Sequence, residues 1–255
     1  MVLTCVYLNR VERFVPIFRN AAQETEIIEN DVMTKTKDPV NQSLVDLMHQ
    51  SGVSKFGIMN NAVWHDDPRR LVFTLSRYKF VSKILSGYDQ VVEIGCGDGF
   101  CARVVKQEVQ NLHVTDFDPL FIEGFREISC EKWPITAAVH DIMKAPLPSR
   151  YDAAYSLDVL EHIDPNSESV FLENVARSLT KDGVGIIGMP SLESQRFASE
   201  ASKAGHVNCK SGTDLKRTLQ KYFKSVFMFS MNDEVVHTGF FPMAHYLMGV
   251  CVGPK

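Results

Sequence analysis

The fold of this chain is decided by the stretch Val91-Val92-Glu93-Ile94-Gly95-Cys96-Gly97-Asp98-Gly99-Phe100. Its apolar run predicts a buried strand, and the three alternating glycines that follow predict a sharp turn into a helix. Because glycine has no Cβ, the backbone of such a turn can approach a ligand closely. Glu93 would lie beneath the loop and orient it. The stretch therefore predicts a ligand-binding loop between a strand and a helix.

The sequence after this loop alternates short apolar runs with amphipathic helical patterns, which indicates a parallel sheet covered by helices on both faces. We expect a doubly wound α/β fold with a mostly parallel, seven-stranded sheet. Two closing strands complete the set of expected strands, which are residues 90–94, 112–115, 136–139, 153–157, 184–189, 226–231 and 246–252.

Local signals place the ends of several helices. Asp67 and Gly87 are typical of the start and stop of a long helix over about residues 68–86, which would lead directly into the first strand. Asp118 before Pro119 predicts an N-cap, and Ser211 predicts another, with Asp214 as its capping-box partner.

The glycine loop resembles motif I of class I methyltransferases that depend on S-adenosylmethionine (SAM). A dinucleotide fingerprint requires the spacing GxGxxG, but Phe100 occupies the position of its third glycine, which disfavours an NAD-dependent dehydrogenase. The resemblance implies that SAM is the cofactor and that the loop binds it through Glu93, Gly95, Cys96, Gly97, Asp98 and Gly99.

Acidic residues follow the next strands in the order that this family would show. Asp116 ends the second strand, where one carboxylate can accept hydrogen bonds from both ribose hydroxyls, and Phe117 could pack on the adenine ring. The resemblance implies that Asp141 and Ile142, after the third strand, meet the adenine amino group. A single Asp after a strand is also a common turn former, so Asp141 keeps that second interpretation.

The fourth strand leads into the pattern Leu157-Asp158-Val159-Leu160-Glu161-His162, which again looks like this family. Backbone groups around Leu157 and Asp158 should line the sulfonium end of SAM. His162 could close over the cofactor or reach the methyl acceptor, and a capping or packing role is the alternative. No sequence signal decides between these two roles.

A polar stretch after the fifth strand contains His206, our candidate for the base that removes the acceptor's proton. An imidazole titrates near neutrality and suits this step. The alternative is a surface histidine that only orders its own loop. His237 and His245 lie in a second polar stretch and are further candidates to meet the acceptor.

The acceptor is expected to be a small molecule, with a sugar as one candidate. The Asp/Asn-Pro-Pro-Tyr/Phe sequence of enzymes that methylate amino groups of DNA bases is replaced by residues 157–160, and none of the six cysteines follows a proline as in cytosine-carbon methyltransferases. A net charge of −4 gives no general attraction to nucleic acid. We therefore expect neither a nucleic-acid partner nor a membrane partner.

The first 66 residues predict a helical extension or lid, or a contact in a homodimer, and residues 67–255 the SAM-binding domain. No metal site is expected, since Asp67 of the group His65, Asp66 and Asp67 is better used as an N-cap. The apolar run Met1–Leu8 lacks a preceding basic region, so we do not expect it to be a secretion signal. Without any CxxC pair, the cysteines fit reduced thiols in a cytoplasm.

These observations favour an enzyme that moves a methyl group from SAM to a hydroxyl or amine. A non-catalytic SAM-binding partner, or regulatory subunit, of another methyltransferase is the alternative from a different class. The intact glycines together with Asp116 and Asp141 argue for retained cofactor binding but do not decide between the two.

Overall fold

The computed structural model describes residues 35–255, and a division between Ser54 and Lys55 separates two compact units. The first unit contains a short turn η1 (Pro39–Asn41) and helix α2 (Gln42–Ser51), and Asp38 caps the turn by accepting from the Val40 amide. Cys5 and the Met1–Leu8 run lie outside the described residues.

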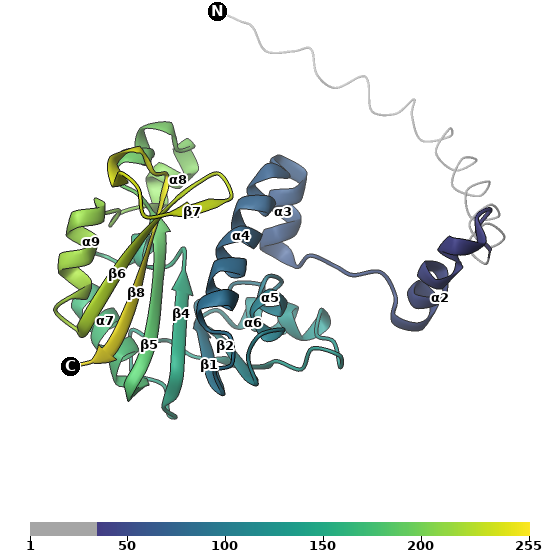
Figure 1. The fold of residues 1–255 in the computed structure, drawn as a ribbon, viewed down its shortest axis with the longest axis horizontal. Helices are drawn as coiled ribbons and strands as arrows, with labels where there is room; N and C mark the ends of the chain where they lie inside the picture. Colours follow the sequence, from purple (N-terminus) through teal and green to yellow (C-terminus); the bar gives the residue numbers. More distant parts are fainter. Residues whose placement is uncertain (1–34) are drawn as a thin grey trace, which may run out of the picture. The chain divides into compact units, whose positions relative to one another are not determined.

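The second unit is built on one eight-stranded sheet with the order β3-β2-β1-β4-β5-β8-β6-β7 (Figure 1). β1 to β5 pair in parallel, and β8 inserts antiparallel between β5 and β6. The strands are β1 (Gln90–Ile94), β2 (Asn111–Asp116), β3 (Thr136–Val139), β4 (Tyr151–Leu157), β5 (Leu179–Pro190), β6 (Phe223–Asn232), β7 (Val235–His237) and β8 (Tyr246–Pro254).

The expected fold class is confirmed, but the expected count of seven strands is one too few. β7 pairs antiparallel with the end of β6 through a tight turn in which Asp233 adopts a left-handed φ of 49°. A strand of three residues is too short to show an alternating pattern, and its polar flanks read as a loop. The missing strand therefore belongs to a hairpin at the edge of the sheet.

Helices cover both faces of the sheet, as the alternating pattern predicts (Figure 1). One core lies between the sheet and helices α4, α5 and α6, and the other lies between the sheet and helices α7 and α9. The helices of this unit are α3 (Ile58–Asp66), α4 (Arg69–Ile84), α5 (Ala102–Lys106), α6 (Pro119–Glu127), α7 (Glu168–Arg177), α8 (Glu200–Gly205) and α9 (Gly212–Leu219), with 3-10 turns η2 (Leu160–His162), η3 (Glu193–Phe197) and η4 (Phe241–Met243). Within residues 35–255, none of these helices is long and apolar enough to span a membrane.

Two of the three predicted helix starts have the expected chemistry; the third, Asp67, lies one residue before the N-cap position of α4, which Pro68 occupies without a side-chain cap. Asp118 accepts a hydrogen bond from the Leu120 amide at the start of α6, and Ser211 accepts one from the Asp214 amide at the start of α9. Both N-caps are thereby confirmed. α4 ends before Gly87, which takes a left-handed φ of 85° and turns the chain toward β1.

A buried polar cluster joins α4 to the centre of the sheet. The Glu93 carboxyl in β1 is 1% exposed and accepts hydrogen bonds from the hydroxyls of Tyr78 in α4 and Tyr155 in β4. Burial raises the pKa of Glu93 to about 8, and the two hydroxyl donors oppose this shift without cancelling it. The cluster ties three elements together directly beneath the glycine loop.

We predict that stability falls with rising pH through this carboxyl group. Its pKa in the folded protein lies above its ordinary value of 4.5, so the folded state binds more protons between pH 4.5 and about 8. Stability from this group is greatest below that window and decreases across it, by up to about 1.4 kcal/mol per pH unit. Urea unfolding between roughly pH 5 and 8 should show this slope in the wild type and a smaller slope in Glu93→Gln.

The variant Tyr78→Phe keeps the titrating carboxyl and serves as the matched control. It should be less stable than the wild type because a buried hydrogen bond is lost, yet it should keep the pH dependence. Parallel pH profiles for the wild type and Glu93→Gln would contradict the assignment.

Candidate functional site

The glycine loop after β1 is held open by its own backbone geometry. The φ values of the three glycines are left-handed, at 78° for Gly95, 54° for Gly97 and 63° for Gly99. Residues that have a Cβ rarely adopt such values. The amides of Gly95 and Cys96 both donate to the carbonyl of Thr115 in β2, at 2.8 and 3.0 Å. The loop is therefore fixed between two strands at the carboxyl edge of the parallel sheet, where α/β folds bind ligands.

Asp116 lies at this edge beside the loop. One carboxylate oxygen accepts from the Gly97 amide at 2.9 Å, and the other accepts from the Asp118 amide at 2.9 Å. The side chain is 6% exposed, and burial raises its pKa. Each oxygen retains acceptor capacity, since an ionised carboxylate offers about four lone-pair sites.

Helix α3 packs over the same loop. Asn60 donates to the carboxylate of Asp98 through its backbone amide at 2.8 Å and through its side-chain amide at 2.7 Å. A Cβ at Gly57 would meet the Asp98 side chain at 2.7 Å, and a Cβ at Gly97 would meet the Met59 sulfur at 2.5 Å. Asp98, expected at the cofactor, is thus engaged by α3.

The expected adenine contacts occupy three different environments. Phe117 is 70% exposed next to Asp116, so its ring is free to cover a ligand. Asp141 accepts from the Met143 amide at 3.0 Å and pairs with Lys144 at 3.2 Å, which is turn-forming behaviour. Ile142 is buried in the core under this turn. The structure therefore shows Asp141 making the turn contacts that the second interpretation describes.

An ion pair fixes the chain where β4 ends. Arg77 of α4 donates to both carboxylate oxygens of Asp158 at 2.9 and 2.7 Å, and its guanidinium lies 3.8 Å from the ring centre of Tyr246. Asp158 has a left-handed φ of 57°, rare for a residue other than glycine. Burial acts to lower the pKa of Arg77, but Asp158, Tyr246 and Glu161 together outweigh it and the pKa is raised. Leu157 before it is buried in the sheet.

The loop that follows brings together the two histidines proposed from sequence. Two hydrogen bonds join the segment 161–162 to the segment 205–208. The Asn208 amide donates to the Glu161 carbonyl at 3.0 Å, and His162 Nδ1 lies 2.9 Å from the Gly205 carbonyl. The rings of His162 and His206 lie 5.1 Å apart in an edge-to-face arrangement. Burial and the neighbouring His162 lower the pKa of His206, which favours its neutral form.

The two other candidate histidines serve the β6–β7 hairpin. His237 contacts the Asn232 side chain at 2.7 Å through Nε2 and accepts from the Gly239 amide at 2.9 Å through Nδ1. His245 Nδ1 accepts from the Asp233 amide at 3.3 Å. Both ring positions are explained by local structure.

Sequence reasoning missed several residues that shape this region: Gly57, Asn60, Arg77, Tyr155 and Tyr246. No motif marks them, because each acts across the fold on a residue far away in the chain. Only the apolar stripe of α4, which includes Tyr78, signalled that this helix packs against the first strand.

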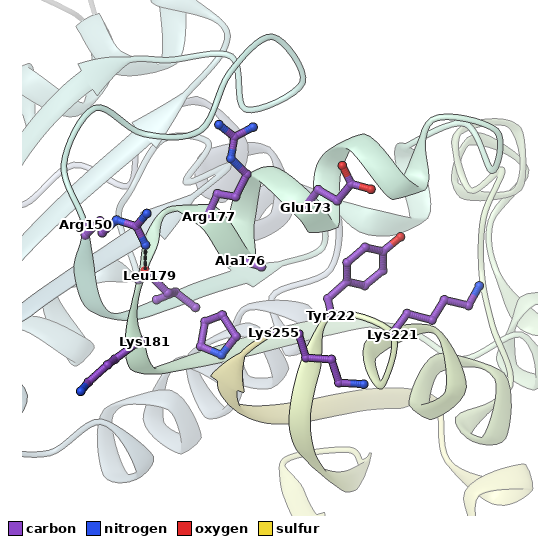
Figure 2. A pocket seen from close by; sticks show the side chains of 10 residues that line it. Arg150, Glu173, Ala176, Arg177, Leu179, Lys181, Lys221, Tyr222 and Lys255 are labelled. Carbon is purple, nitrogen blue, oxygen red and sulfur yellow. Dashed lines mark hydrogen bonds between the residues drawn. The ribbon is translucent and has the colours of Figure 1, made fainter.

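A basic hollow lies at the opposite edge of the sheet. Figure 2 shows side chains from the start of β5, the end of β8, α7 and the turn after α9 around it. It is lined by Arg150, Glu173, Ala176, Arg177, Leu179, Lys181, Lys221, Tyr222, Pro254 and Lys255. Since the glycine loop and both histidines lie at the carboxyl edge of the parallel strands, this hollow is separate from the candidate site.

The comparisons with known proteins agree with this geometry. A methyltransferase domain family matches residues 91–183, while no curated protein matches the chain. Among solved structures, the N-methyltransferase NodS from Bradyrhizobium japonicum WM9, in complex with S-adenosylhomocysteine (SAH), is 19% identical, with a TM-score of 0.56 over 75% of this chain and 91% of that chain.

Two further structures extend the likeness of fold. The methyltransferase domain of a bacterial Hen1 is 18% identical, with a TM-score of 0.60 over 72% of this chain and all (100%) of that chain. Magnesium protoporphyrin IX methyltransferase from Synechocystis PCC 6803, with bound SAM, is 16% identical, with a TM-score of 0.50 over 92% of this chain and 95% of that chain. These likenesses show the fold, and the match over residues 91–183 identifies that segment as similar to a methyltransferase domain.

Proposed function

We propose that this protein binds SAM across the carboxyl edge of β1, β2 and β4 and transfers its methyl group to a hydroxyl or amine of a small molecule such as a sugar. The observation that carries the proposal is the contact between the Asp116 carboxylate and the Gly97 amide. It joins the glycine loop and the acidic end of β2 into one concave edge. Other solved structures of this fold contain SAH or SAM, which supports the choice of cofactor.

In this arrangement the backbone of residues 95–99 faces the methionine and ribose parts of SAM. Asp116 accepts from the ribose hydroxyls, and the exposed ring of Phe117 covers the adenine. Asp141 and Ile142 form the turn at the adenine edge. Leu157 and Asp158 line the sulfonium end, where Arg77 holds the Asp158 carboxylate in place.

Helix α3 acts as the lid of the site. It reaches the loop through Asn60 on Asp98 and through Met59 against Gly97. Both contacts are made by the ligand-facing segment of the loop, so α3 must shift when SAM enters and can close again over the bound cofactor. This assigns a lid role to the part of the extension nearest the catalytic domain.

The protein would act mainly by alignment, because SAM itself supplies the reactivity. Holding the acceptor atom, the methyl carbon and the sulfur in line lowers the entropic part of the barrier. His162 and His206 lie at the acceptor side and take part in removing the acceptor's proton. The lowered pKa of His206 favours its neutral ring, which suits this role.

The five cysteines among the described residues are free thiols, and three of them are buried. Reduced thiols support a cytoplasmic site of action.

We expect Asp116→Ala to weaken SAH binding by about 1 to 3 kcal/mol, because the ribose hydroxyls lose a charged acceptor in a partly dry site. Isothermal titration calorimetry measures this directly. The matched control is Asp118→Ala, two residues away, which removes the cap of α6 and should lower stability by about 1 kcal/mol with SAH affinity retained. Unchanged SAH affinity in folded Asp116→Ala would show that another group holds the ribose.

His206→Ala should lower single-turnover methyl transfer by about 10² to 10⁴ once the acceptor is known, because the acceptor's proton is no longer handled at this position. SAH affinity should hardly change, since the histidine faces the acceptor. Labelled SAM incubated with metabolite pools identifies the acceptor by its mass gain. Wild-type rates in His206→Ala would exclude the role, and His237→Ala, altered only in the hairpin, is the control.

A further inference from the structure

Glu161 is the most unusual charged residue near the proposed acceptor position. It follows β4 in turn η2, and its side chain is 1% exposed. Neither carboxylate oxygen accepts a hydrogen bond from another residue of the described chain, 35–255. A buried carboxylate without donors is strongly unfavourable, so this group is ionised only where a cation or a hydrogen-bond donor reaches it.

His162 and His206 offer nitrogens to the same place. One ligand atom from each of Glu161, His162 and His206 lies within 4.8 Å of the others. Metal ions in proteins are commonly held by three such groups, with further positions left to water or substrate. Bonds of about 2.1 Å would need these donors to move together by only about 1 Å.

The hydrogen bonds of the His162 and His206 rings use Nδ1 and leave Nε2 of each ring available as a metal ligand. His162 Nδ1 lies 2.9 Å from the Gly205 carbonyl, which can only accept, so Nδ1 donates and Nε2 keeps its lone pair. The Gln195 side-chain nitrogen donates to the Ser191 carbonyl at 3.1 Å, which turns its oxygen toward His206 Nδ1 at 2.8 Å. His206 Nδ1 is therefore a donor as well, and its Nε2 is free.

Such outer contacts are typical of histidines that bind metals. An Nδ1–H bond to a carbonyl or amide oxygen fixes the tautomer and the ring orientation and makes Nε2 the ligand. The backbone around the group is equally fixed, because Asn208 donates its amide to the Glu161 carbonyl at 3.0 Å. The ligand set is thus supported by its surroundings before any ion arrives.

We propose that Glu161, His162 and His206 bind a divalent transition-metal cation of the Zn²⁺ or Co²⁺ kind. Two imidazoles and one carboxylate suit such a cation better than Mg²⁺ or Ca²⁺, which prefer oxygen ligands. This proposal differs from our expectation from sequence, which was that the chain has no metal site. The group considered there is used otherwise, because Asp66 and Asp67 pair with Arg70 and Arg69.

The position of the cation suggests its use, and this part rests on the proposed function. With the cation bound, His162 and His206 would promote loss of the acceptor's proton as metal ligands and would not accept the proton themselves. Val159, two residues before Glu161, lies so close to the glycine loop that a Cβ at Gly95 would meet it at 2.4 Å. A hydroxyl of the acceptor bound to the cation would lose its proton to solvent more readily. Its oxygen then forms a bond to the methyl carbon as the carbon–sulfur bond breaks, and the electron pair of that bond remains on sulfur in SAH.

The test uses tag-free full chain, treated with a chelator and dialysed, and titrated with Co²⁺ while visible absorption is recorded. One equivalent should bind with the ligand-field bands of a nitrogen and oxygen site. Zn²⁺ should displace it, and a roughly 1,000-fold excess of Mg²⁺ should not. Co²⁺ should also raise the melting temperature, because it binds the folded state.

Glu161→Gln and His206→Gln should each weaken Co²⁺ binding by at least about 100-fold and remove the shift in melting temperature. Gln195→Ala, which changes only an outer contact, should weaken it by about 10- to 100-fold. His65→Gln is the matched control, since His65 is exposed in the last turn of α3, and it should bind Co²⁺ as the wild type does. His206 lies in a half-buried loop, so its variant tests the site even if the buried Glu161 variant folds poorly.

SAH affinity is measured on every variant to separate the two proposals. Loss of Co²⁺ binding with SAH binding retained supports the metal site. The metal proposal alone is overturned if the wild-type chain binds SAH but shows no saturable Co²⁺ site or loses its Co²⁺ to Mg²⁺. It is also overturned if Glu161→Gln and His206→Gln bind Co²⁺ as tightly as the wild type does. A chain that binds Co²⁺ at this site but not SAH would instead refute the proposed cofactor.

Discussion

The buried carboxyl of Glu93 is the constraint on which the candidate site depends. It lies inside the sheet, two residues before the glycine loop begins at Gly95, and it joins the first strand to Tyr78 of α4 and Tyr155 of β4. Because a buried carboxyl must have its donors in place, α4 cannot slide along the sheet without breaking this contact. Arg77, the residue before Tyr78, is thereby set against Asp158 at the end of β4. One polar cluster thus fixes both sides of the cofactor edge.

Much of the fold could be predicted from the sequence because its signals are local. Strand periodicity, the glycines of residues 95–99 and the caps at Asp118 and Ser211 act within a few residues of themselves. β7 was not predicted because a strand of three residues is too short to show an alternation of apolar and polar residues. Arg77, Asn60 and Tyr246 escaped because their partners are 38 to more than 80 residues away, and no local pattern records such a contact.

The candidate histidines also show that sequence patterns do not reveal contacts between residues far apart in the chain. Sequence analysis treated His162 and His206 as separate candidates with separate alternatives, since 44 residues divide them. The fold places them edge to face through the bond from His162 Nδ1 to the Gly205 carbonyl and the bond from the Asn208 amide to the Glu161 carbonyl, and no local pattern records either bond. From the sequence, Glu161 was recognised only as the residue before His162. Its missing donors become visible only when the whole surrounding chain is in place.

Backbone strain at one residue links the cofactor edge to the acceptor side. Asp158 holds a left-handed φ, which costs about 1 kcal/mol or more for a residue with a Cβ and persists only where neighbouring contacts enforce it. Those contacts are the two bonds from Arg77 and the bond from the Asp158 amide to the Gly188 carbonyl at 3.0 Å. The turn directs the chain away from the sheet, so that Val159 packs on Gly95 and Glu161 faces His206. A relaxed turn at this point would separate the acceptor-side residues from the glycine loop, which is a physical reason for the strain to lie here.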